Sequence, residues 1–275
     1  MKWNGFLFSL CLLVSNYSNA QAPASYNASE IYQHIKKLSV LGSVLYVAAH
    51  PDDENMIGPV LAKFGRLGYE VQVIIATDGR DGTRVTKIPA GDSLGKLRQQ
   101  ESICACTALQ INAPIFLHLE RLDTKIGVRA YLNAHQQLLV LLRKYIDHLN
   151  PDIIISFGPD GEYGHPEHIV VGSTVIDVLL REGWVERYPL YFPIVKKSRK
   201  EDPEISYADD RYINLEIAFS QTDKDKYFAA AKCYVTQFTQ EEMKEIVESE
   251  SNENNNLIHF RKFIVAKGVQ KDLFK

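Results

Sequence analysis

The sequence predicts an α/β protein, a Rossmann-like three-layer sandwich with a mainly parallel sheet. Apolar strand-like runs alternate with amphipathic helical segments from residue 43 to residue 183, which is the pattern of a parallel sheet covered by helices on both faces. The first run, "SVLYVAA" (43–49), is continuously apolar, as in a strand buried on both faces. No break in composition interrupts this region, so we expect residues 21–275 to form a single domain.

The regular part of the chain contains four strands, each followed by a helix. Strands rich in Val, Ile and Leu are predicted at 43–49, 69–77, 114–119 and 152–159. Helices with apolar residues at helical spacing are predicted at 57–68, 93–111, 128–149 and 166–183. The first of these helices ends at Gly68, a residue type that commonly terminates helices.

The pattern is weaker at both ends of the chain. A short helix is predicted at 29–38, before the first strand. Further strands are predicted at 190–195 and 212–220, and a helix at 222–238. Two polar stretches, 197–210 and 248–256, are expected to be surface loops.

The N-terminus has the features of a secretory signal peptide. It begins with one lysine, continues with an apolar core from Phe6 to Val14, and ends with the small-residue pattern Ser18-Asn19-Ala20. The core is too short to span a bilayer, and the order of these parts is typical of a signal peptide. We expect residues 1–20 to be removed near Ala20 and the mature chain to be exported, either to a periplasm or out of the cell. A buried N-terminal helix is the alternative.

The composition is that of an ordinary globular protein, with 45% hydrophobic and 24% charged residues. A net charge of −3 and a pI near 6.3 do not predict a basic surface for nucleic acid, so no nucleic-acid partner is expected. No segment after the N-terminal one has 18 unbroken apolar residues, so no membrane span is expected in the mature chain. The sequence carries no signal for the oligomeric state.

Three cysteines remain after the expected cleavage, namely Cys104, Cys106 and Cys233. An odd number excludes a complete set of disulfides. Cys104 and Cys106 lie two apart on a predicted helix and do not face each other, so we expect both to be small buried hydrophobic residues. A disulfide involving Cys233 is compatible with an exported protein.

Polar side chains follow three of the predicted strands at the point where each strand ends. "HPDDE" follows the first strand and supplies His50, Asp52 and Asp53, and the Gly-rich segment 78–84 follows the second. "GPDGEYGHPEH" (158–168) follows the fourth. In an open parallel sheet, ligands bind beyond the carboxyl ends of the strands, so we expect these groups to form one site.

Histidine and carboxylate are zinc ligands, and a catalytic zinc site uses three protein ligands. Adjacent Asp52 and Asp53 point in different directions in an extended loop, so one is expected to bind metal and the other to face the water. His165 and His168 lie three apart at a helix start, so they share a face. One aspartate and one histidine then remain for proton transfer.

Each motif also has a structural interpretation. "HPDDE" alone suits a solvated turn, and "HPEH" alone suits a helix start with surface histidines. Their occurrence at the same end of neighbouring elements favours a functional site. The other histidines have no such neighbours and are expected to be structural or surface residues, namely His34, His118, His135, His148 and His259. No G-x-S-x-G or G-x-G-x-x-G motif follows a strand, so serine-hydrolase and dinucleotide-binding signals are missing.

Four segments taken together resemble the PIG-L/LmbE family of zinc-dependent N-deacetylases. They are "AAHPDDEN", "TDGRDGTR", "LRQQESICACTALQI" and "NPDIIISFGPDGEYGHPEHIVVG", and they span about residues 43–175. A weaker similarity lies in "AAAKCYVTQF" (229–238). The resemblance implies the same fold and a metal-dependent hydrolase.

The resemblance also implies roles for individual residues. It implies that His50, Asp53 and His168 bind the metal and that Asp52 is the general base toward water. It implies that His165 is the acid toward the leaving amine, or an oxyanion donor, and that Tyr163 is a hydrogen-bond donor to the oxyanion. Sugar contacts are implied for Arg98 and, more weakly, for Asp123, and supporting positions around the site for Glu54 and Asp160.

Two arginines have alternative interpretations. The family loop usually carries a glutamate where this chain has Arg80, which indicates either a different substrate or a salt bridge with Asp78 or Asp81. Arg98 is also spaced to pair with Glu101 on its own helix, a contact worth only about a few tenths of a kcal/mol.

The activity implied by the resemblance is removal of an acetyl group from an N-acetyl amino sugar or a related glycoconjugate, so the expected partner is a small-molecule or glycan substrate. The implied cofactor is Zn²⁺, although two histidines and one carboxylate also suit Fe²⁺. The first alternative is an amidase acting on a non-sugar acylated small molecule. The second is a non-catalytic sugar-binding protein, which Asp52 and His165 argue against because a binder needs neither.

Overall fold

The computed structural model describes residues 41–196, 207–252 and 256–273. The expected signal peptide (1–20) and the predicted helix at 29–38 lie outside the described residues. So does most of the predicted loop at 197–210. Among the described helices, none is long and apolar enough to cross a membrane.

The described strands form one mainly parallel sheet with the order β3-β2-β1-β4-β5-β8-β7, in which β6 pairs with β5. The predicted fold class is therefore confirmed. Its strands are β1 (Ser43–Ala48), β2 (Glu70–Thr77), β3 (Ile115–Leu119), β4 (Ile153–Ser156), β5 (Leu190–Lys196), β6 (Tyr207–Ala208), β7 (Leu215–Ala218) and β8 (Leu257–Lys262). The register β1 to β2 and β1 to β4 is parallel, with Val44 opposite both Val71 and Ile153.

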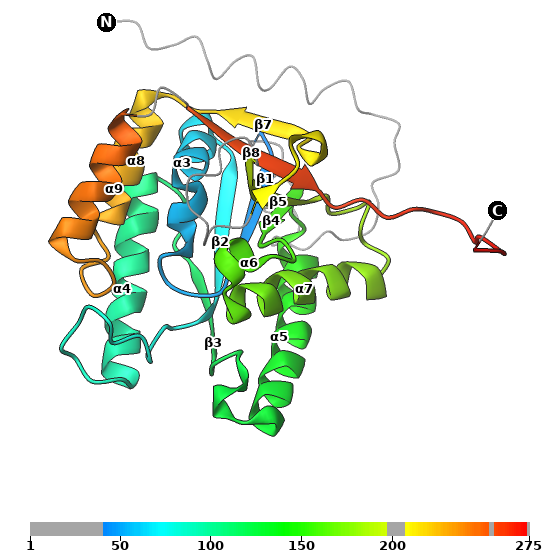
Figure 1. Cartoon of the computed structure of the whole chain (residues 1–275), viewed down its shortest axis with the longest axis horizontal. Helices are drawn as coiled ribbons and strands as arrows, with labels where there is room; N and C mark the ends of the chain where they lie inside the picture. Colours follow the sequence, from blue (N-terminus) through cyan, green and yellow to red (C-terminus); the bar gives the residue numbers. More distant parts are fainter. Residues whose placement is uncertain (1–40, 197–206, 253–255, 274–275) are drawn as a thin grey trace, which may run out of the picture. The chain divides into compact units, whose positions relative to one another are not determined.

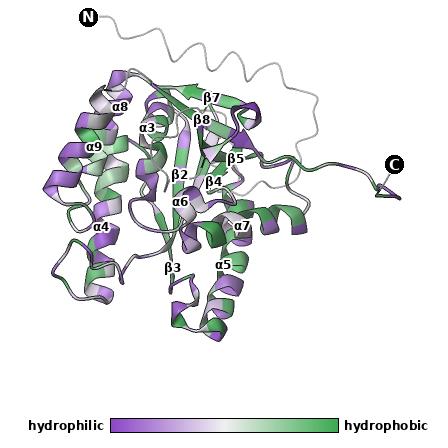
Figure 2. Ribbon diagram, viewed as in Figure 1, coloured by the Kyte–Doolittle hydropathy of each residue, from purple (hydrophilic) through white to green (hydrophobic). Residues whose placement is uncertain are grey.

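Helices cover both faces of this sheet (Figure 1). One core packs β1 side chains such as Tyr46 against α3 (Gly58–Leu67), α4 (Asp92–Leu109) and α8 (Gln221–Ala231). The other packs Leu45 and Val47 against α5 (Val128–Leu149) and α7 (Pro166–Arg181). Since side chains alternate along a strand, the continuous apolar run of β1 supplies both cores. Figure 2 shows hydrophobic colour concentrated on the strands and both colours on the helices.

The last third of the fold agrees with the prediction in part, since β5 and β7 lie where strands were predicted at 190–195 and 212–220. The predicted helix at 222–238 ends at Ala231, and the predicted loop at 248–256 is wrong in its first half because α9 (Gln240–Asn252) covers it. Thr239 and Glu242 form reciprocal side-chain-to-backbone hydrogen bonds at the start of α9. This capping box was readable in the sequence as "TQEE". Strand β8 then runs antiparallel between β5 and β7.

The cysteines also differ in part from the prediction. Cys104 on α4 forms a disulfide with Cys233, 129 residues away, so the interpretation of Cys104 as a free buried residue is wrong. The pairing of Cys233 and the burial of a free Cys106 are both confirmed. Spacing along the helix excluded only a Cys104–Cys106 pair and carried no information about a partner from the far end of the chain.

Candidate active site

The chain turns sharply after β1, and this turn separates the two aspartates. Asp52 has a φ of 101°, in the left-handed region that residues other than glycine rarely adopt. After this residue, Asp53 begins a 3₁₀ turn. Its Oδ2 atom accepts hydrogen bonds from the backbone N–H groups of Ala49 and His50, both at 2.7 Å. The other oxygen, Oδ1, is therefore the one left to face the neighbouring histidines.

A second segment brings two histidines to the same place. After β4, the short helix α6 (Gly161–Gly164) leads to His165, the residue before α7, and His168 follows in the first turn of α7. The imidazole of His168 stacks on Phe157, with ring centroids 3.9 Å apart. A Cβ atom at Gly172 would overlap the carbonyl oxygen of Phe157, so glycine lets α7 approach the end of β4 closely.

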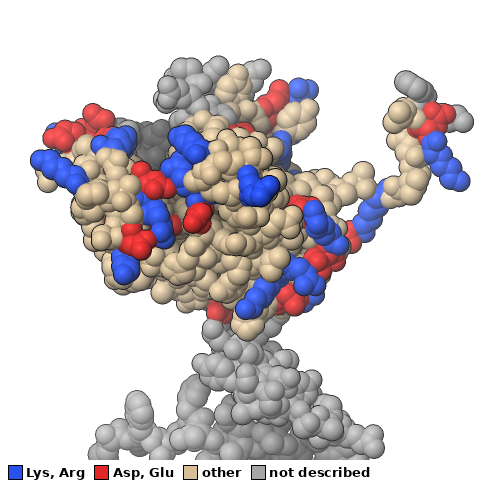
Figure 3. All heavy atoms as spheres, turned by 90° about the horizontal axis from the view of Figure 1, so that it is seen from below, with Lys and Arg blue, Asp and Glu red and all other residues tan. Residues whose placement is uncertain are grey.

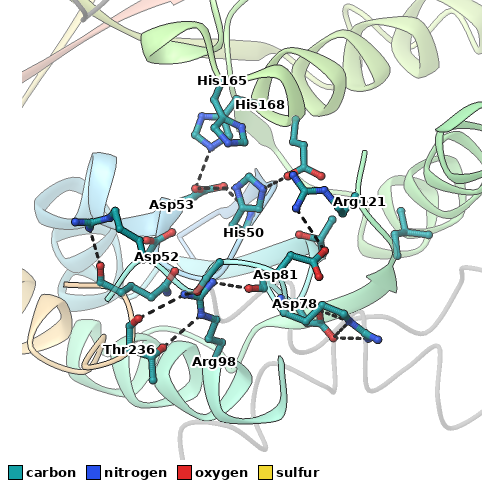
Figure 4. A pocket seen from close by; sticks show the side chains of 18 of the residues that line it. His50, Asp52, Asp53, Asp78, Asp81, Arg98, Arg121, His165, His168 and Thr236 are labelled. Carbon is teal, nitrogen blue, oxygen red and sulfur yellow. Dashed lines mark hydrogen bonds and ion pairs between the residues drawn. The ribbon is translucent and has the colours of Figure 1, made fainter. Parts of the chain in front are cut away.

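The predicted metal-binding residues meet between these two segments (Figure 4). His168 Nε2 lies 3.2 Å from Asp53 Oδ1, and His50 Nδ1 lies 3.7 Å from the same oxygen. Nitrogen atoms of His50, His165 and His168 all lie within 4.8 Å of one another. The structure therefore brings together three histidines and one carboxylate oxygen.

These residues fit a divalent metal ion. Both ring nitrogens of His168 and Nδ1 of His165 are buried, and no hydrogen bond satisfies them within the described residues. A buried polar atom without a partner is costly, and such atoms often mark a missing ion or water. Neutral imidazole nitrogen and carboxylate oxygen are the donors that zinc takes.

His50 is held by carboxylates on two sides. Its Nε2 atom lies 2.6 Å from Glu167 Oε2, and Glu167 also accepts a hydrogen bond from the backbone N–H of Leu122. Burial disfavours a charged His50 ring, but the hydrogen bonds and charges of Asp53 and Glu167 outweigh it and raise its pKa to about 10. The electrostatic potential at the His50 ring therefore strongly favours a positive charge there.

The two residues predicted to move protons lie beside this cluster. Burial, followed by the charge of Asp53, raises the pKa of Asp52 well above its usual range. No described residue donates a hydrogen bond to the Asp52 carboxylate, whereas Asp53 accepts two through Oδ2. The pKa of His165 falls to about 4, because burial and the charges of His50 and His168 disfavour a proton there.

Tyr163 and Glu162 also lie beside these histidines. The phenol ring of Tyr163 is 52% exposed and its centroid lies 5.7 Å from that of His165. Glu162 was not predicted from the sequence, yet its Oε2 atom lies 3.6 Å from His168 Nδ1. Burial, followed by the charge of Asp53, raises the pKa of Glu162 to about 7. Its φ of 70° and ψ of −68° form a strained turn of the kind that recurs at functional sites.

A cavity of about 940 Å³ opens over the histidines and Asp52. Its size is at the upper end of cavities that enclose a small molecule. The C-terminal part of the chain supplies one wall: Gln237 Nε2 donates to the carbonyl oxygen of Pro51 at 2.7 Å, and Thr236 and Phe238 also line the cavity. The remaining lining comes mainly from the loop after β2 and from residues 119–126 after β3.

Arg98 lines the cavity as predicted, but its guanidinium is already engaged. It donates to the carbonyl oxygens of Gly79 and Gly82, and Nε lies 3.3 Å from Thr236 Oγ1. The expected alternative, a pair with Glu101, is replaced by hydrogen bonds from Thr236 N and Oγ1 to the Glu101 carboxylate, both at 2.8 Å. Arg98 therefore joins the loop after β2 to the C-terminal wall, and its sugar contact stays a prediction.

Asp123 does not line this cavity. Its carboxylate binds the guanidinium of Arg121 at 2.6 Å and accepts a hydrogen bond from the backbone N–H of Lys125, and both of these partners do line the cavity. The structure thus places Asp123 where it orients Arg121, a residue that the sequence did not single out. Its direct sugar contact stays a prediction.

Charges of both signs lie close together on this side of the molecule (Figure 3). Arg80 pairs with Asp78 and with Asp92, both at 2.6 Å, which confirms the predicted loop salt bridge to Asp78. Arg84 pairs with Glu242 on α9. Glu54 is buried, and its Oε2 accepts the backbone N–H of Asp52 at 3.2 Å, as a supporting residue would; Asp160 does not line the cavity.

Comparison with protein families gives a match over the segment that carries the site. Residues 45–179 match the family described as PIG-L, GlcNAc-PI de-N-acetylase, and this range contains "HPDDE" and "GHPEH" with the geometry above. Residues 45–179 belong to the PIG-L family. The resemblance to PIG-L/LmbE proteins predicted from the sequence is therefore confirmed, and the wall formed by Thr236 and Gln237 lies beyond the PIG-L segment.

Several curated relatives of this chain share one name. The chain is 30% identical over 176 residues to 1D-myo-inositol 2-acetamido-2-deoxy-alpha-D-glucopyranoside deacetylase of Mycobacterium sp. (strain JLS), a match covering 58% of this chain and 56% of that protein. It is 30% identical over 163 residues to the protein of that name from Rhodococcus jostii (strain RHA1), a match covering 53% of this chain and 56% of that protein. The chain thus spans just over half the length of the curated relatives it matches.

Solved structures share the fold of this chain at low sequence identity. Teicoplanin deacetylase Orf2, in a zinc-inhibited form, gives a TM-score of 0.61 at 13% identity over 80% of this chain and 97% of that one. N,N'-diacetylchitobiose deacetylase from Pyrococcus horikoshii gives a TM-score of 0.57 at 18% sequence identity, and the match covers 88% of this chain and 95% of that one. GalB, a 4-carboxy-2-hydroxymuconate hydratase from Pseudomonas putida KT2440, gives a TM-score of 0.59 at 15% sequence identity, and the match covers 85% of this chain and 100% of that one. The fold alone therefore does not fix the reaction.

Proposed function

We propose that this chain is a metal-dependent N-deacetylase that removes the acetyl group from an N-acetyl amino sugar or a related glycoconjugate. One observation carries the proposal. The Asp52 carboxylate, which accepts no hydrogen bond from the described residues, lies next to a cluster of His50, Asp53 and His168 in which both buried ring nitrogens of His168 make no hydrogen bond within the described residues. A base beside a set of metal donors is the arrangement that metal-assisted amide hydrolysis requires.

His50, Asp53 and His168 would hold the metal. Asp53 would use Oδ1, because Oδ2 is occupied by two backbone N–H groups. His165 is near enough for its ring to join the set of donors, and its position one turn before His168 equally suits it to face the substrate. A bound Zn²⁺ ion supplies a Lewis acid that polarises a carbonyl group and lowers the pKa of water to about 7.

The remaining residues would move protons. Asp52 accepts a proton from the attacking water, and its raised pKa brings it closer to the range in which a base works at neutral pH. The proton that Asp52 takes from the water must reach the departing amine, and His165 would pass it on; its lowered pKa leaves the ring largely unprotonated near neutral pH, so it gives up this proton readily. Burial, followed by the charge of Asp53, raises the pKa of Tyr163, so the phenol keeps its proton and donates it in a hydrogen bond to the oxyanion.

An amino sugar suits the cavity better than a purely apolar amide. Its lining includes both acidic and basic side chains, among them Asp78, Arg80, Asp81 and Arg121, which can bind several hydroxyl groups in fixed positions. The names of the curated relatives, which are deacetylases of an acetamido sugar linked to inositol, support the same substrate class. The signal peptide expected at residues 1–20 supports a place of action outside the cytoplasm.

A panel assay tests this proposal. Release of acetate or of free amine is measured across N-acetyl amino sugars and non-sugar acetamides, with and without chelator, while metal analysis follows purification without added zinc. Turnover of at least one amino sugar that chelator abolishes is expected. Chelator-resistant turnover, or turnover of non-sugar amides alone, would contradict the metal or the sugar part of the proposal respectively.

A further inference from the structure

A second cavity lies directly beyond the C-terminal wall of the first. It measures about 680 Å³ and is lined by the segment from Lys232 to Glu248 together with Val85. Val85 and Phe238 line both cavities. The two are therefore neighbouring compartments separated by a small number of side chains.

The second cavity has a different chemical character from the first. Apolar side chains make up most of its lining. They come from the loop after β2, from the segment between α8 and α9, and from α9, namely Val85, Tyr234, Val235, Phe238, Met243 and Val247. Val235 is 69% exposed. Lys232, Lys244 and Glu248 provide charged groups at its border. Tyr234 is buried and the other four apolar side chains are partly buried, so the cavity presents a partly exposed apolar surface bordered by polar side chains, which is typical of a binding surface.

The wall between the cavities is held in place from several sides. The disulfide joins Cys233 to α4, Thr236 binds Glu101 on the same helix, and Gln237 binds Pro51. Arg84, one residue before Val85, is paired with Glu242 on α9. Because the wall is fixed by contacts within the chain, a group entering the second cavity would not have to order the wall, and less binding energy would be lost.

We propose that the second cavity is a subsite for an apolar group, an alkyl or acyl chain, attached to the amino sugar. This inference rests on the proposed function, because the sugar must place its acetamide at Asp52 and the histidines. The substituent then passes Val85 and Phe238 and contacts Val235, Met243 and Val247. The charged first cavity and the apolar second cavity together select an amphiphilic glycoside over a free sugar.

The test compares two monomeric substrates, the methyl and the hexyl β-glycosides of N-acetylglucosamine, below the aggregation concentration of the latter. The value of kcat/KM for the hexyl glycoside is expected to be at least about tenfold higher, because several buried methylene groups contribute. Val235→Asp should reduce this ratio at least threefold and leave turnover of the methyl glycoside unchanged. Val140→Asp is the matched control, because Val140 is a similarly exposed valine (62%) on α5 that lines neither cavity.

Binding of both glycosides to the holoenzyme, measured by calorimetry, separates the two proposals. Val235-dependent preference for the hexyl glycoside without turnover of either would support the subsite and contradict the proposed function. Equal kcat/KM for the two glycosides, or a preference that survives both Val235→Asp and Val247→Asp, would overturn the subsite. So would a dimer that dissociates in Val235→Asp, which would make this surface an interface between copies of the chain.

Discussion

The Nε2 atom of His50 lies 2.6 Å from the Oε2 atom of Glu167, which in turn accepts the backbone N–H of Leu122. Glu167 therefore fixes the orientation and tautomer of a proposed metal ligand, as carboxylates behind ligating histidines commonly do. We expect Glu167→Gln to lower metal affinity by about 10–100-fold while the fold is kept. Competition with a chelator of known affinity measures this change. Unchanged metal affinity would show that Glu167 does not act through His50.

Asp52→Asn separates base catalysis from metal binding. The amide keeps the size of the side chain but cannot accept a proton, so turnover should fall by about 10²–10⁴. Metal content should stay that of the wild type, since Asp53 and the histidines are untouched. Both kcat and bound metal are measured on the same preparation. Full activity would disprove the assignment of Asp52 as base.

His168→Ala should remove the metal itself. The ring contributes nitrogens that face Asp53 Oδ1 at 3.2 Å and Glu162 at 3.6 Å, and alanine offers no donor. Elemental analysis of the purified variant should show little bound metal, and added zinc should not restore turnover. His118→Ala is the control, because His118 lies on β3 outside the cavity lining and should retain the metal.

The ion pair between Arg66 and Asp223 should contribute stability that depends on pH. Arg66 donates to both oxygens of Asp223, at 2.7 and 2.9 Å. Asp223 and Ser220 also form the capping box of α8, in which each side chain accepts a hydrogen bond from the backbone N–H of the other. Burial opposes the charge of Asp223, but these contacts outweigh it and hold its pKa below the usual range. Asp223→Asn should cost about 2–3 kcal/mol at pH 7.

The direction of this pH dependence follows from the lowered pKa of Asp223. The contribution is fully present above the pKa of an unfolded aspartate, about 3.9, and is lost as the pH falls through the lower folded value. Urea unfolding at several pH values should therefore show that the difference in free energy of unfolding between the wild type and Asp223→Asn becomes smaller in acid. Asp177→Asn, which breaks an exposed pair with Arg181, should cost under about 1 kcal/mol at any pH. A gap for Asp223→Asn that is constant with pH would contradict the charge argument.

The disulfide should stabilise the fold and the C-terminal wall. Closing a loop of this length restricts the unfolded chain, and loss of such a bond typically costs about 2–5 kcal/mol. Cys104→Ser with Cys233→Ser should show this loss in urea unfolding without reductant. Reductant should destabilise the wild type and leave the double variant unaffected. Equal stability of the two proteins without reductant would mean that the bond contributes nothing.

The first two thirds of the fold and the centre of the site followed from local patterns. Apolar runs such as 43–49 and the residues that end each strand specify both the sheet and the edge at which His50, Asp53 and His168 meet. The C-terminal third followed only in part. Strands β5 and β7 and helix α8 lie in segments where they were predicted, but the contacts that this part makes with the site are single contacts over long separations. Nothing near Cys233 or Gln237 in sequence indicates a partner on α4 or at Pro51. Glu167 and Arg121 were missed for the same reason, although their charge beside a predicted site was a usable signal.

The hydrogen bond from Gln237 to Pro51 spans 186 residues, and this separation sets an order of events during synthesis. A chain that emerges from its N-terminus at about 5–20 residues per second has made Pro51 roughly 10–40 s before Gln237. His168 emerges well within that interval. The metal donors can therefore assemble on a nascent chain whose cavity still lacks one side, and a substrate-sized compartment exists only once the last helices have arrived.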